Sequence, residues 1–239
     1  MSDNPRAELR RCADEVGSMV RGVFASLDGI DAGVRQVWEE SSAAGFGAPS
    51  SGEFSSITRI VRERVLDPEV PLHGAGVLFA PGLLRDADLH LEWWQNVRHT
   101  ARMLTLDFNP TSERYYDYPS TGWFAVARDE HRATVAGPYV DLYGADAYIF
   151  TFARPVLVDE TFIGVVGADV SLVDNEAQLT APLKEFDEDS VLVTAEGRVI
   201  AASSPQWTPG MLFRPDGLSS GHRAVVAADT VDWEVVSLG

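Results

Sequence analysis

The sequence predicts an α+β fold: a long N-terminal helix packed on an antiparallel sheet, followed by a second, smaller β-rich lobe. Two patterns predict it. Apolar residues recur at alternating steps of four and three over residues 5–42, and short apolar runs separated by turn residues begin near residue 74. The 239 residues, 45% of them apolar, are enough to build a real core. We divide the chain into residues 1–172, the helix with the larger lobe, and 173–239, the smaller lobe.

The first helix carries an apolar stripe with heptad spacing. The stripe consists of Val16, Val20, Val23, Leu27, Ile30, Val34 and Val37. Two interpretations remain open: the stripe packs on the protein's own sheet, or it forms a seam with a second copy in a homodimer. Glycines within the same helix weaken a free-standing coiled coil, because glycine is a poor helix former.

The remaining elements follow from shorter patterns. A second helix is predicted over residues 54–65, where apolar residues occupy one face, and Pro68 follows its end. Strands are predicted at 76–80, 91–95, 102–106, 147–152 and 162–170, with short helices at 124–132 and 171–186. The smaller lobe begins with a hairpin of residues 191–194 and 198–201, and two strands follow at 224–228 and 233–236.

The charge balance limits the partners of this chain. Its 36 acidic and 19 basic residues give a net charge of −17, which repels nucleic acid and anionic membrane surfaces. The single cysteine, Cys12, allows no intramolecular disulfide. No secretory signal opens the sequence, and no window approaches the roughly 18 apolar residues of a membrane span. For a complete chain these features predict a cytoplasmic protein without a membrane segment.

The common catalytic motifs are absent from the sequence. There is no Gly-x-Ser-x-Gly elbow and no phosphate-binding loop ending in Gly-Lys-Ser or Gly-Lys-Thr. The Gly74-Ala75-Gly76 run lacks the third glycine of a dinucleotide-binding fingerprint, and the five histidines have no metal-ligand spacing. We therefore expect a protein that is not an enzyme and uses no cofactor or metal.

The most informative segment is rich in aromatic residues. Four of the six tyrosines fall within residues 115–139, together with Trp123 and Phe124. Rings at this density either fill a core or line a pocket. A buried tyrosine hydroxyl or indole N–H needs a partner, and a pocket supplies one.

Several blocks of this region resemble the Cache family of sensor domains. The blocks are residues 123–124, 137–141, 151–156 and 162–172, and residues 191–201 resemble the opening hairpin of the second module in two-module members. Their order and spacing together carry the resemblance, which covers about residues 70–239. It implies two PAS-like sheets behind a long N-terminal helix, and a function in reversible ligand sensing.

The resemblance also implies a set of binding residues. Members that bind amino acids use a Tyr, an Arg, a Trp, a second Tyr and an Asp. These positions fall on Tyr116, Trp123, Tyr139 and Asp169, while Thr121 stands where the family has Arg. A threonine cannot hold a ligand carboxylate in a bidentate pair. What remains is the part of the site that holds an amino group.

We therefore expect a non-catalytic sensor of an amine or amino-acid-like metabolite that signals to a partner protein. The ammonium would pair with Asp169 and lie against the aromatic rings, with Asp117 or Asp141 as a second negative group. The alternative role of Asp169 is to cap a helix that begins near Ser171.

Two other functions stay open at the level of sequence. The protein would bind a small carboxylate if Arg154, Arg128 or Arg132 replaced the missing arginine by pointing inward. It would be an interaction domain without a ligand pocket if the aromatic rings simply filled a core.

Overall fold

The computed structural model describes residues 5–45, 47–142, 147–186, 188–214 and 222–238. The chain folds into two compact units, one made of residues 1–22 and 172–239, the other of residues 23–171. Helices and antiparallel sheets occur in both units, which confirms the α+β class. The structure groups the first 22 residues with the C-terminal lobe, whereas the division made from the sequence placed them with the larger one.

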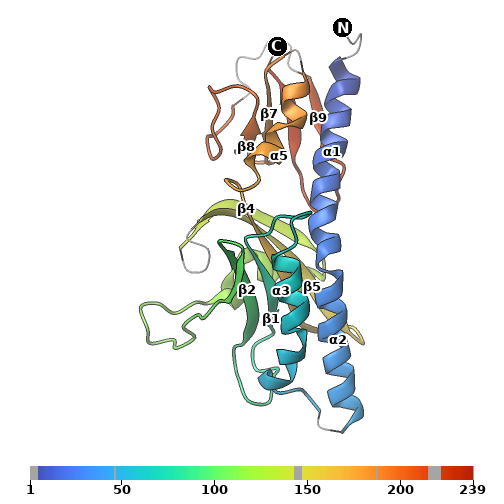
Figure 1. Cartoon of the computed structure of the whole chain (residues 1–239), viewed down its shortest axis with the longest axis vertical. Coiled ribbons are helices and arrows are strands. Elements are labelled where there is room, and N and C mark those ends of the chain that lie inside the picture. Colours follow the sequence, from blue (N-terminus) through green and yellow to red (C-terminus); the bar gives the residue numbers. More distant parts are fainter. Residues whose placement is uncertain (1–4, 46, 143–146, 187, 215–221, 239) are drawn as a thin grey trace. The chain divides into compact units, whose positions relative to one another are not determined.

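The N-terminal segment forms two helices separated by one residue. They are α1 (Pro5–Ser26) and α2 (Asp28–Ala43), and together they span the single helix predicted over residues 5–42 (Figure 1). The apolar stripe is buried within the chain: Val16, Leu27, Ile30 and Val34 are fully inaccessible. The stripe thus packs within this protein, as the first of the two interpretations requires. No described helix is long and apolar enough to cross a membrane.

The larger unit is built on a six-stranded sheet in which all neighbouring strands are antiparallel. The order of its strands is β3-β2-β1-β6-β5-β4. The strands are β1 (Gly74–Phe79), β2 (Leu91–Val97), β3 (Thr100–Met103), β4 (Thr134–Asp141), β5 (Ala147–Val158) and β6 (Thr161–Ser171).

One face of this sheet is covered by α2 together with the 3-10 helix η1 (Ser51–Ile57) and helix α3 (Thr58–Val65). Phe54 of η1 packs on Phe79 of β1, with ring centroids 4.3 Å apart. The helix predicted over residues 54–65 is confirmed, although its first part is a 3-10 helix. A capping box begins η1: the Glu53 side chain accepts from the backbone N–H of Ser50, and the Ser50 side chain accepts from the backbone N–H of Glu53.

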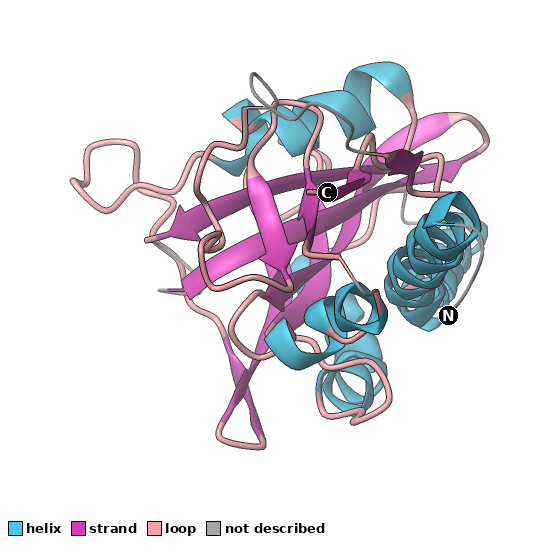
Figure 2. Ribbon diagram, turned by 90° about the horizontal axis from the view of Figure 1, so that it is seen from above, coloured by secondary structure: helices cyan, strands magenta, loops and turns pink. Residues whose placement is uncertain are grey.

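The opposite face is covered by η2 (Tyr118–Ser120) and α4 (Gly122–Glu130), so that helices flank the strands on both sides (Figure 2). A core of aromatic and aliphatic side chains lies between α4 and the sheet. Tyr118 is fully buried there and donates its hydroxyl to the carbonyl oxygen of Phe79 at 2.7 Å. Part of the tyrosine-rich segment is therefore core, and Phe124 packs edge-on against Tyr118.

Two prolines explain where the sheet differs from the sequence-based prediction. Strand β4 was not predicted, because Gly137-Pro138 interrupts its apolar pattern and a bulge shifts its register between Ala136 and Tyr139. As an edge strand, β4 tolerates a proline. Strand β5 continues through Pro155, where a connection was predicted. Its pairing with β4 ends at Ala153, so no ladder bond on that side is lost.

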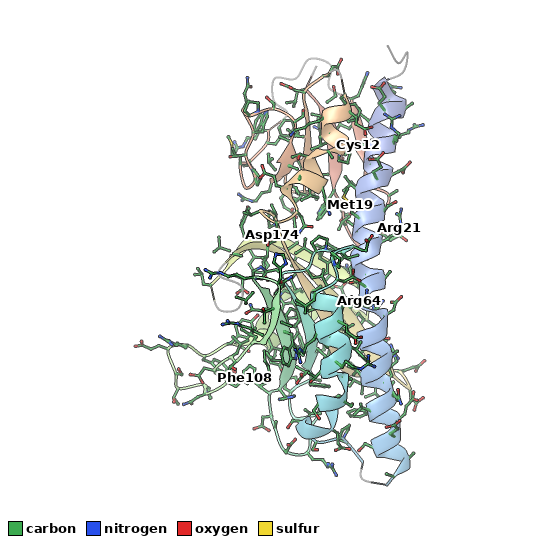
Figure 3. The ribbon with its side chains drawn as sticks, viewed as in Figure 1. Cys12, Met19, Arg21, Arg64, Phe108 and Asp174 are labelled. Carbon is green, nitrogen blue, oxygen red and sulfur yellow. The ribbon has the colours of Figure 1, made fainter. Side chains whose placement is uncertain are left out.

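The smaller unit contains a four-stranded antiparallel sheet in the order β8-β7-β10-β9. The strands are β7 (Ser190–Val193), β8 (Val199–Ala202), β9 (Arg223–Val225) and β10 (Glu234–Ser237). The hairpin and the two later strands predicted for this lobe are confirmed. The helix predicted over residues 171–186 is wrong: Ser171 ends β6, and only α5 (Glu176–Thr180) and η3 (Pro182–Glu185) are helical. Helix α1 belongs to this smaller unit up to residue 22. Its Arg21 side chain (Figure 3) donates a hydrogen bond to the backbone carbonyl oxygen of Ala227.

Candidate ligand-binding cavity

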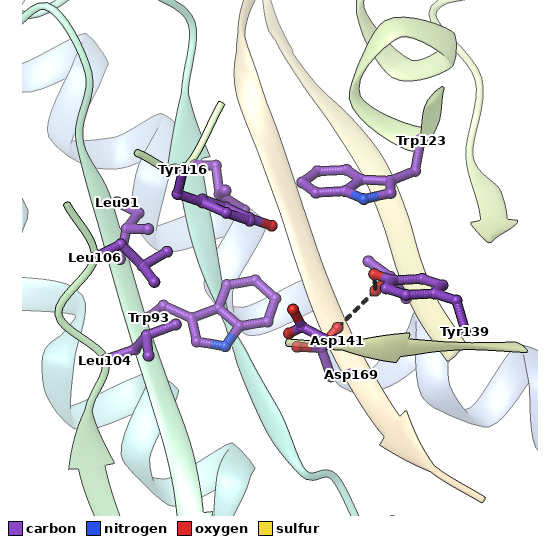
Figure 4. A pocket seen from close by; sticks show the side chains of 11 residues that line it. Leu91, Trp93, Leu104, Leu106, Tyr116, Trp123, Tyr139, Asp141 and Asp169 are labelled. Carbon is purple, nitrogen blue, oxygen red and sulfur yellow. Dashed lines mark hydrogen bonds between the residues drawn. The ribbon is translucent and has the colours of Figure 1, made fainter. Parts of the chain in front are cut away.

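A cavity lies on the face of the six-stranded sheet that α4 covers. Its free volume is small, about 30 Å³, within a wider space that opens to solvent. Its wall is made of aliphatic and aromatic side chains, three hydroxyls and two carboxyl groups (Figure 4). The lining residues are Leu78, Leu91, Trp93, Leu104, Leu106, Tyr116, Trp123, Tyr139, Asp141, Thr151 and Asp169.

The alternation of strand residues decides which side chains reach this cavity. On β2, Trp93 faces the cavity, whereas Glu92 faces α3 and accepts a hydrogen bond from Thr58. Room for the cavity comes from glycines that leave the sheet surface bare. A Cβ at Gly74 would lie 2.7 Å from Trp93 Nε1, and one at Gly167 would lie 3.5 Å from the far edge of the same indole. The Trp93 ring therefore lies flat across β1 and forms the cavity floor.

A chain of hydrogen bonds ends on the carboxylate of Asp169. Thr151 Oγ1 donates to Asp169 Oδ1 at 2.8 Å. Because a hydroxyl has one proton, Tyr139 must be the donor in the 2.6 Å contact between its hydroxyl and Thr151 Oγ1. Each donor in such a chain polarises the next, which stabilises negative charge at its end.

Burial nevertheless dominates the ionisation of Asp169, which is only 7% exposed. Loss of hydration raises the pKa of its carboxyl to about 7, the Thr151 hydrogen bond opposes that rise, and the nearby charge of Asp141 adds to it. None of the lining residues is Lys, Arg or His. The undescribed residues 143–146, which follow Asp141 and Leu142 in the chain, are Tyr, Gly, Ala and Asp and carry no cation either.

The two tyrosines of the cavity are also held neutral. Burial raises the pKa of the Tyr116 hydroxyl, and the charge of Asp141 adds to this effect. Burial likewise raises the pKa of Tyr139, with the charge of Asp169 as the next cause. The site thus presents aromatic faces and neutral hydroxyls around a pair of carboxyl groups. Such a surface suits a cation with an apolar body.

The structure brings together most of the binding residues that the resemblance implied. Tyr116, Trp123, Tyr139 and Asp169 line one cavity, although they come from a loop, a helix and two strands (Figure 4). Asp141, expected as a second negative group, lines it as well. Whether these residues bind a ligand stays a prediction.

Two other predicted residues do not line the cavity itself. Thr121 and Asp117 line a wider groove that shares Tyr116, Trp123, Tyr139 and Asp141 with it. Thr121 donates to the carbonyl oxygen of Tyr118 at 2.7 Å, and Asp117 accepts from the Ser120 hydroxyl at 2.6 Å. Both are thereby tied to the turn that precedes α4.

The arginines considered as carboxylate anchors do not point inward. Arg154 follows the inward-facing Ala153 on β5, so its side chain leaves on the opposite face and pairs with Asp28 of α2 at 2.7 Å. Arg128 pairs with the adjacent Asp129, and Arg132 pairs with Glu130, all on partly exposed side chains.

The interpretation of Asp169 as a helix cap is wrong. It lies inside β6, where it pairs with Gly74 of β1 and Thr151 of β5, and the next helix begins only at Glu176.

Reasoning from sequence missed two polar members of the cavity, Trp93 and Thr151. Thr151 gives a signal that would have found it, since it is the one polar residue in the run from Ile149 to Ala153. Trp93 gives no comparable signal, because Trp94 beside it is as aromatic and only the strand's register decides which one faces inward. No cluster of three or more His, Cys, Asp or Glu capable of holding a metal exists among the described residues.

Comparisons with known proteins identify a related family and related folds. Residues 74–174 match the family described as the first PDC sensor domain of methyl-accepting chemotaxis protein-like proteins. Over 87 residues, 36% of this chain, the sequence is 32% identical to methyl-accepting chemotaxis protein PscA of Pseudomonas syringae pv. tomato (strain ATCC BAA-871 / DC3000). That match spans only 13% of the relative's length.

Solved structures resemble the whole chain at low identity. A structure of methyl-accepting chemotaxis protein X superposes with a TM-score of 0.69 at 15% identity, covering 96% of this chain and 94% of the other. The ligand-binding domain of the Pseudomonas fluorescens chemoreceptor CtaA, solved in complex with L-valine, gives a TM-score of 0.65 at 15% identity. It covers 97% of this chain and 93% of its own. These likenesses establish a shared fold.

Proposed function

Residues 74–174 belong to the PDC sensor domains of the Cache type, and on this premise we propose that the chain is a non-catalytic sensor of a small ammonium-bearing metabolite. The resemblance to Cache domains inferred from the sequence blocks is confirmed over this range. The ligand class proposed is an amine or an amino-acid-like molecule, held in the cavity beneath α4. Binding is reversible and is read out by a separate signalling partner.

One observation carries this proposal: a partly open cavity has two carboxyl groups, Asp141 and Asp169, and no cation among its lining residues. A buried carboxylate without a cation is costly, so a ligand ammonium would relieve that cost. The faces of Tyr116, Trp123 and Tyr139 add cation–π attraction of roughly 0.5–2 kcal/mol each when the site is dry. The CtaA domain, which shares the fold, was solved with an ammonium-bearing ligand, L-valine.

The rival functions have less support. A carboxylate ligand lacks an inward-facing arginine, since Arg154 is paired with Asp28. An interaction domain with a filled core does not account for the cavity. A homodimer through the N-terminal helix stays a prediction, and it would have to use residues outside the buried stripe.

The direct test is a thermal-shift and calorimetric comparison of small amines, amino acids and organic acids. A ligand of the folded state raises the melting temperature by mass action. Asp169→Asn should weaken binding of the active amines by roughly 10- to 100-fold, because it removes a charge-assisted hydrogen bond. Asp159→Asn is the matched control. Asp159 lies exposed in the β5–β6 turn with φ +47°, a conformation that asparagine adopts readily.

Two results would overturn the proposal. Stabilisation by organic acids alone would contradict a cation site. Equal binding by the wild type and by a folded Asp169→Asn variant would show that the buried carboxylate does not hold the ligand.

A further inference from the structure

The cavity contains a hydrogen-bond donor that the proposed ammonium does not use. Trp93 is 5% exposed, and its indole Nε1 has no hydrogen-bond partner in the structure. The neighbouring Trp94 differs, since its indole donates to Glu92 Oε1 at 2.8 Å on the other face of the sheet. A buried N–H without a partner costs free energy, and a ligand acceptor would remove that cost.

Two hydroxyls of the cavity wall are already committed as donors. Tyr139 donates to Thr151, and Thr151 donates to Asp169. Of the two indoles that line the cavity, Trp93 is the one whose N–H is buried without a partner among the described residues. It points toward the side of the cavity that holds the carboxyl groups (Figure 4).

The register of the sheet fixes where this donor lies relative to Asp169. Trp93 Nε1 lies over Gly74, because a Cβ at Gly74 would approach it to 2.7 Å. Gly74 pairs directly with Asp169 on the adjacent strand. The donor thus lies over the residue beside Asp169, on strands whose backbones are roughly 5 Å apart. A ligand with its ammonium and its acceptor on neighbouring carbons is compact enough to satisfy both.

The acceptor must also be neutral. A ligand carboxylate beside Trp93 would face Asp141 and Asp169, and no lining residue offers it a positive charge. A single indole N–H does not compensate for two like charges in a site shielded from water. A hydroxyl or a carboxamide has the same acceptor oxygen without the charge.

Resting on the proposed function, we infer that Trp93 is a specificity-determining residue and that the ligand is a 1,2-amino alcohol or an α-amino amide, not a free α-amino acid. The ammonium pairs with Asp169, and the neutral oxygen accepts from Trp93 Nε1. Thr121, which stands outside the cavity, contributes no charge that would change this preference.

The test compares four compounds that share a branched tail: valinol, valinamide, isobutylamine and valine. Calorimetry on the wild-type chain should rank valinol and valinamide about tenfold above isobutylamine, by one hydrogen bond. Valine should bind more weakly than valinamide. In Trp93→Phe the advantage of valinol over isobutylamine should disappear, while isobutylamine binding changes by less than about threefold. Trp94→Phe, the matched control, should keep the advantage, because that indole serves Glu92.

The outcomes separate this inference from the function on which it rests. Valine binding as tightly as valinamide overturns the inference, and so does a valinol advantage that survives Trp93→Phe. If isobutylamine still binds and still depends on Asp169, the proposed amine sensor stands without the inference. If none of the four compounds binds, both fail. The ranking on the wild type needs no variant, so a misfolded Trp93→Phe chain does not prevent the decision.

Discussion

At the scale of single residues, the site depends on Asp169 and on the groups that surround it. Its carboxylate accepts from Thr151, at the end of a donor chain that starts at Tyr139. Burial outweighs this support, so that its pKa rises to about 7. The empty site therefore sits near the balance between a neutral acid and a carboxylate at neutral pH. A ligand ammonium would shift that balance toward the carboxylate.

This balance predicts opposite pH trends for stability and for binding. Between about pH 4 and pH 7 the folded state holds a proton on Asp169 that the unfolded state has released, so this group's contribution to stability falls as pH rises. Ammonium binding needs the carboxylate, so amine affinity should rise over the same window, by at most about tenfold per pH unit, and level off above about pH 7. Isothermal calorimetry of isobutylamine across this range measures the trend.

Proton release gives an independent check of the same prediction. Below about pH 7, binding should release up to one proton, which calorimetry in buffers of different ionisation enthalpy detects. In Asp169→Asn the fall in stability that Asp169 causes between about pH 4 and pH 7 should vanish. An amine affinity that stays flat or falls from pH 5 to pH 7 would contradict the raised pKa.

At the scale of elements, two glycines of the N-terminal helices lie where another segment of the chain packs closely against the helix. A Cβ at Gly17 of α1 would lie 2.8 Å from the carbonyl oxygen of Ala227 and 3.2 Å from the Arg21 guanidinium. In α2, a Cβ at Gly33 would lie 3.0 Å from Ile57. Gly22, by contrast, has no atom within 4 Å of the place where a Cβ would stand. Helix propensity and packing therefore act in opposite directions at Gly17 and Gly33, but not at Gly22.

Alanine substitutions at Gly17 and Gly22 should change the stability of the chain in opposite directions, although both residues lie in α1. Gly22→Ala should stabilise the chain by about 0.5–1 kcal/mol, because alanine is the better helix former. Gly17→Ala should destabilise it by about 1 kcal/mol or more, because the helix or the segment at Ala227 must move to accommodate the methyl group. Urea unfolding of the full chain measures both changes. A stabilised Gly17→Ala variant would show that the approach at Ala227 relaxes freely.

At the scale of the whole molecule, the charge of −17 surrounds the site with a negative field. Such a field attracts a cationic ligand over distances of about a Debye length, roughly 10 Å at 0.1 M salt.

The field predicts a salt effect on the rate of binding. The association rate of a monocationic amine should fall severalfold as NaCl rises from about 0.02 to about 0.3 M, whereas its dissociation rate should change little. Stopped-flow tryptophan fluorescence suits this measurement, since Trp93 and Trp123 line the cavity. An association rate that is independent of salt would mean that the cavity's own groups, and not the net charge, attract the ligand.

The sequence by itself determined the class of fold and most of the elements. The stripe of Val16, Val20 and Leu27 was enough to place the first helix, and the runs around Val77 and Val165 were enough to place buried strands, because these patterns are local and periodic. The tyrosine-rich segment and Asp169 were identified through a family resemblance. Proline hid β4 and the far half of β5, since the tolerance of a sheet for proline depends on which strand lies at its edge.

The tertiary structure alone decided what faces the cavity. Asp169 is a strand carboxyl and not a helix cap, and Arg154 leaves the sheet on the opposite face, because strand register assigns alternate residues to opposite sides. The same register selected Trp93 over Trp94 and placed its N–H level with Asp169 through Gly74. Periodicity in a sequence records which residues are apolar, but the pairing of distant strands decides which polar groups meet.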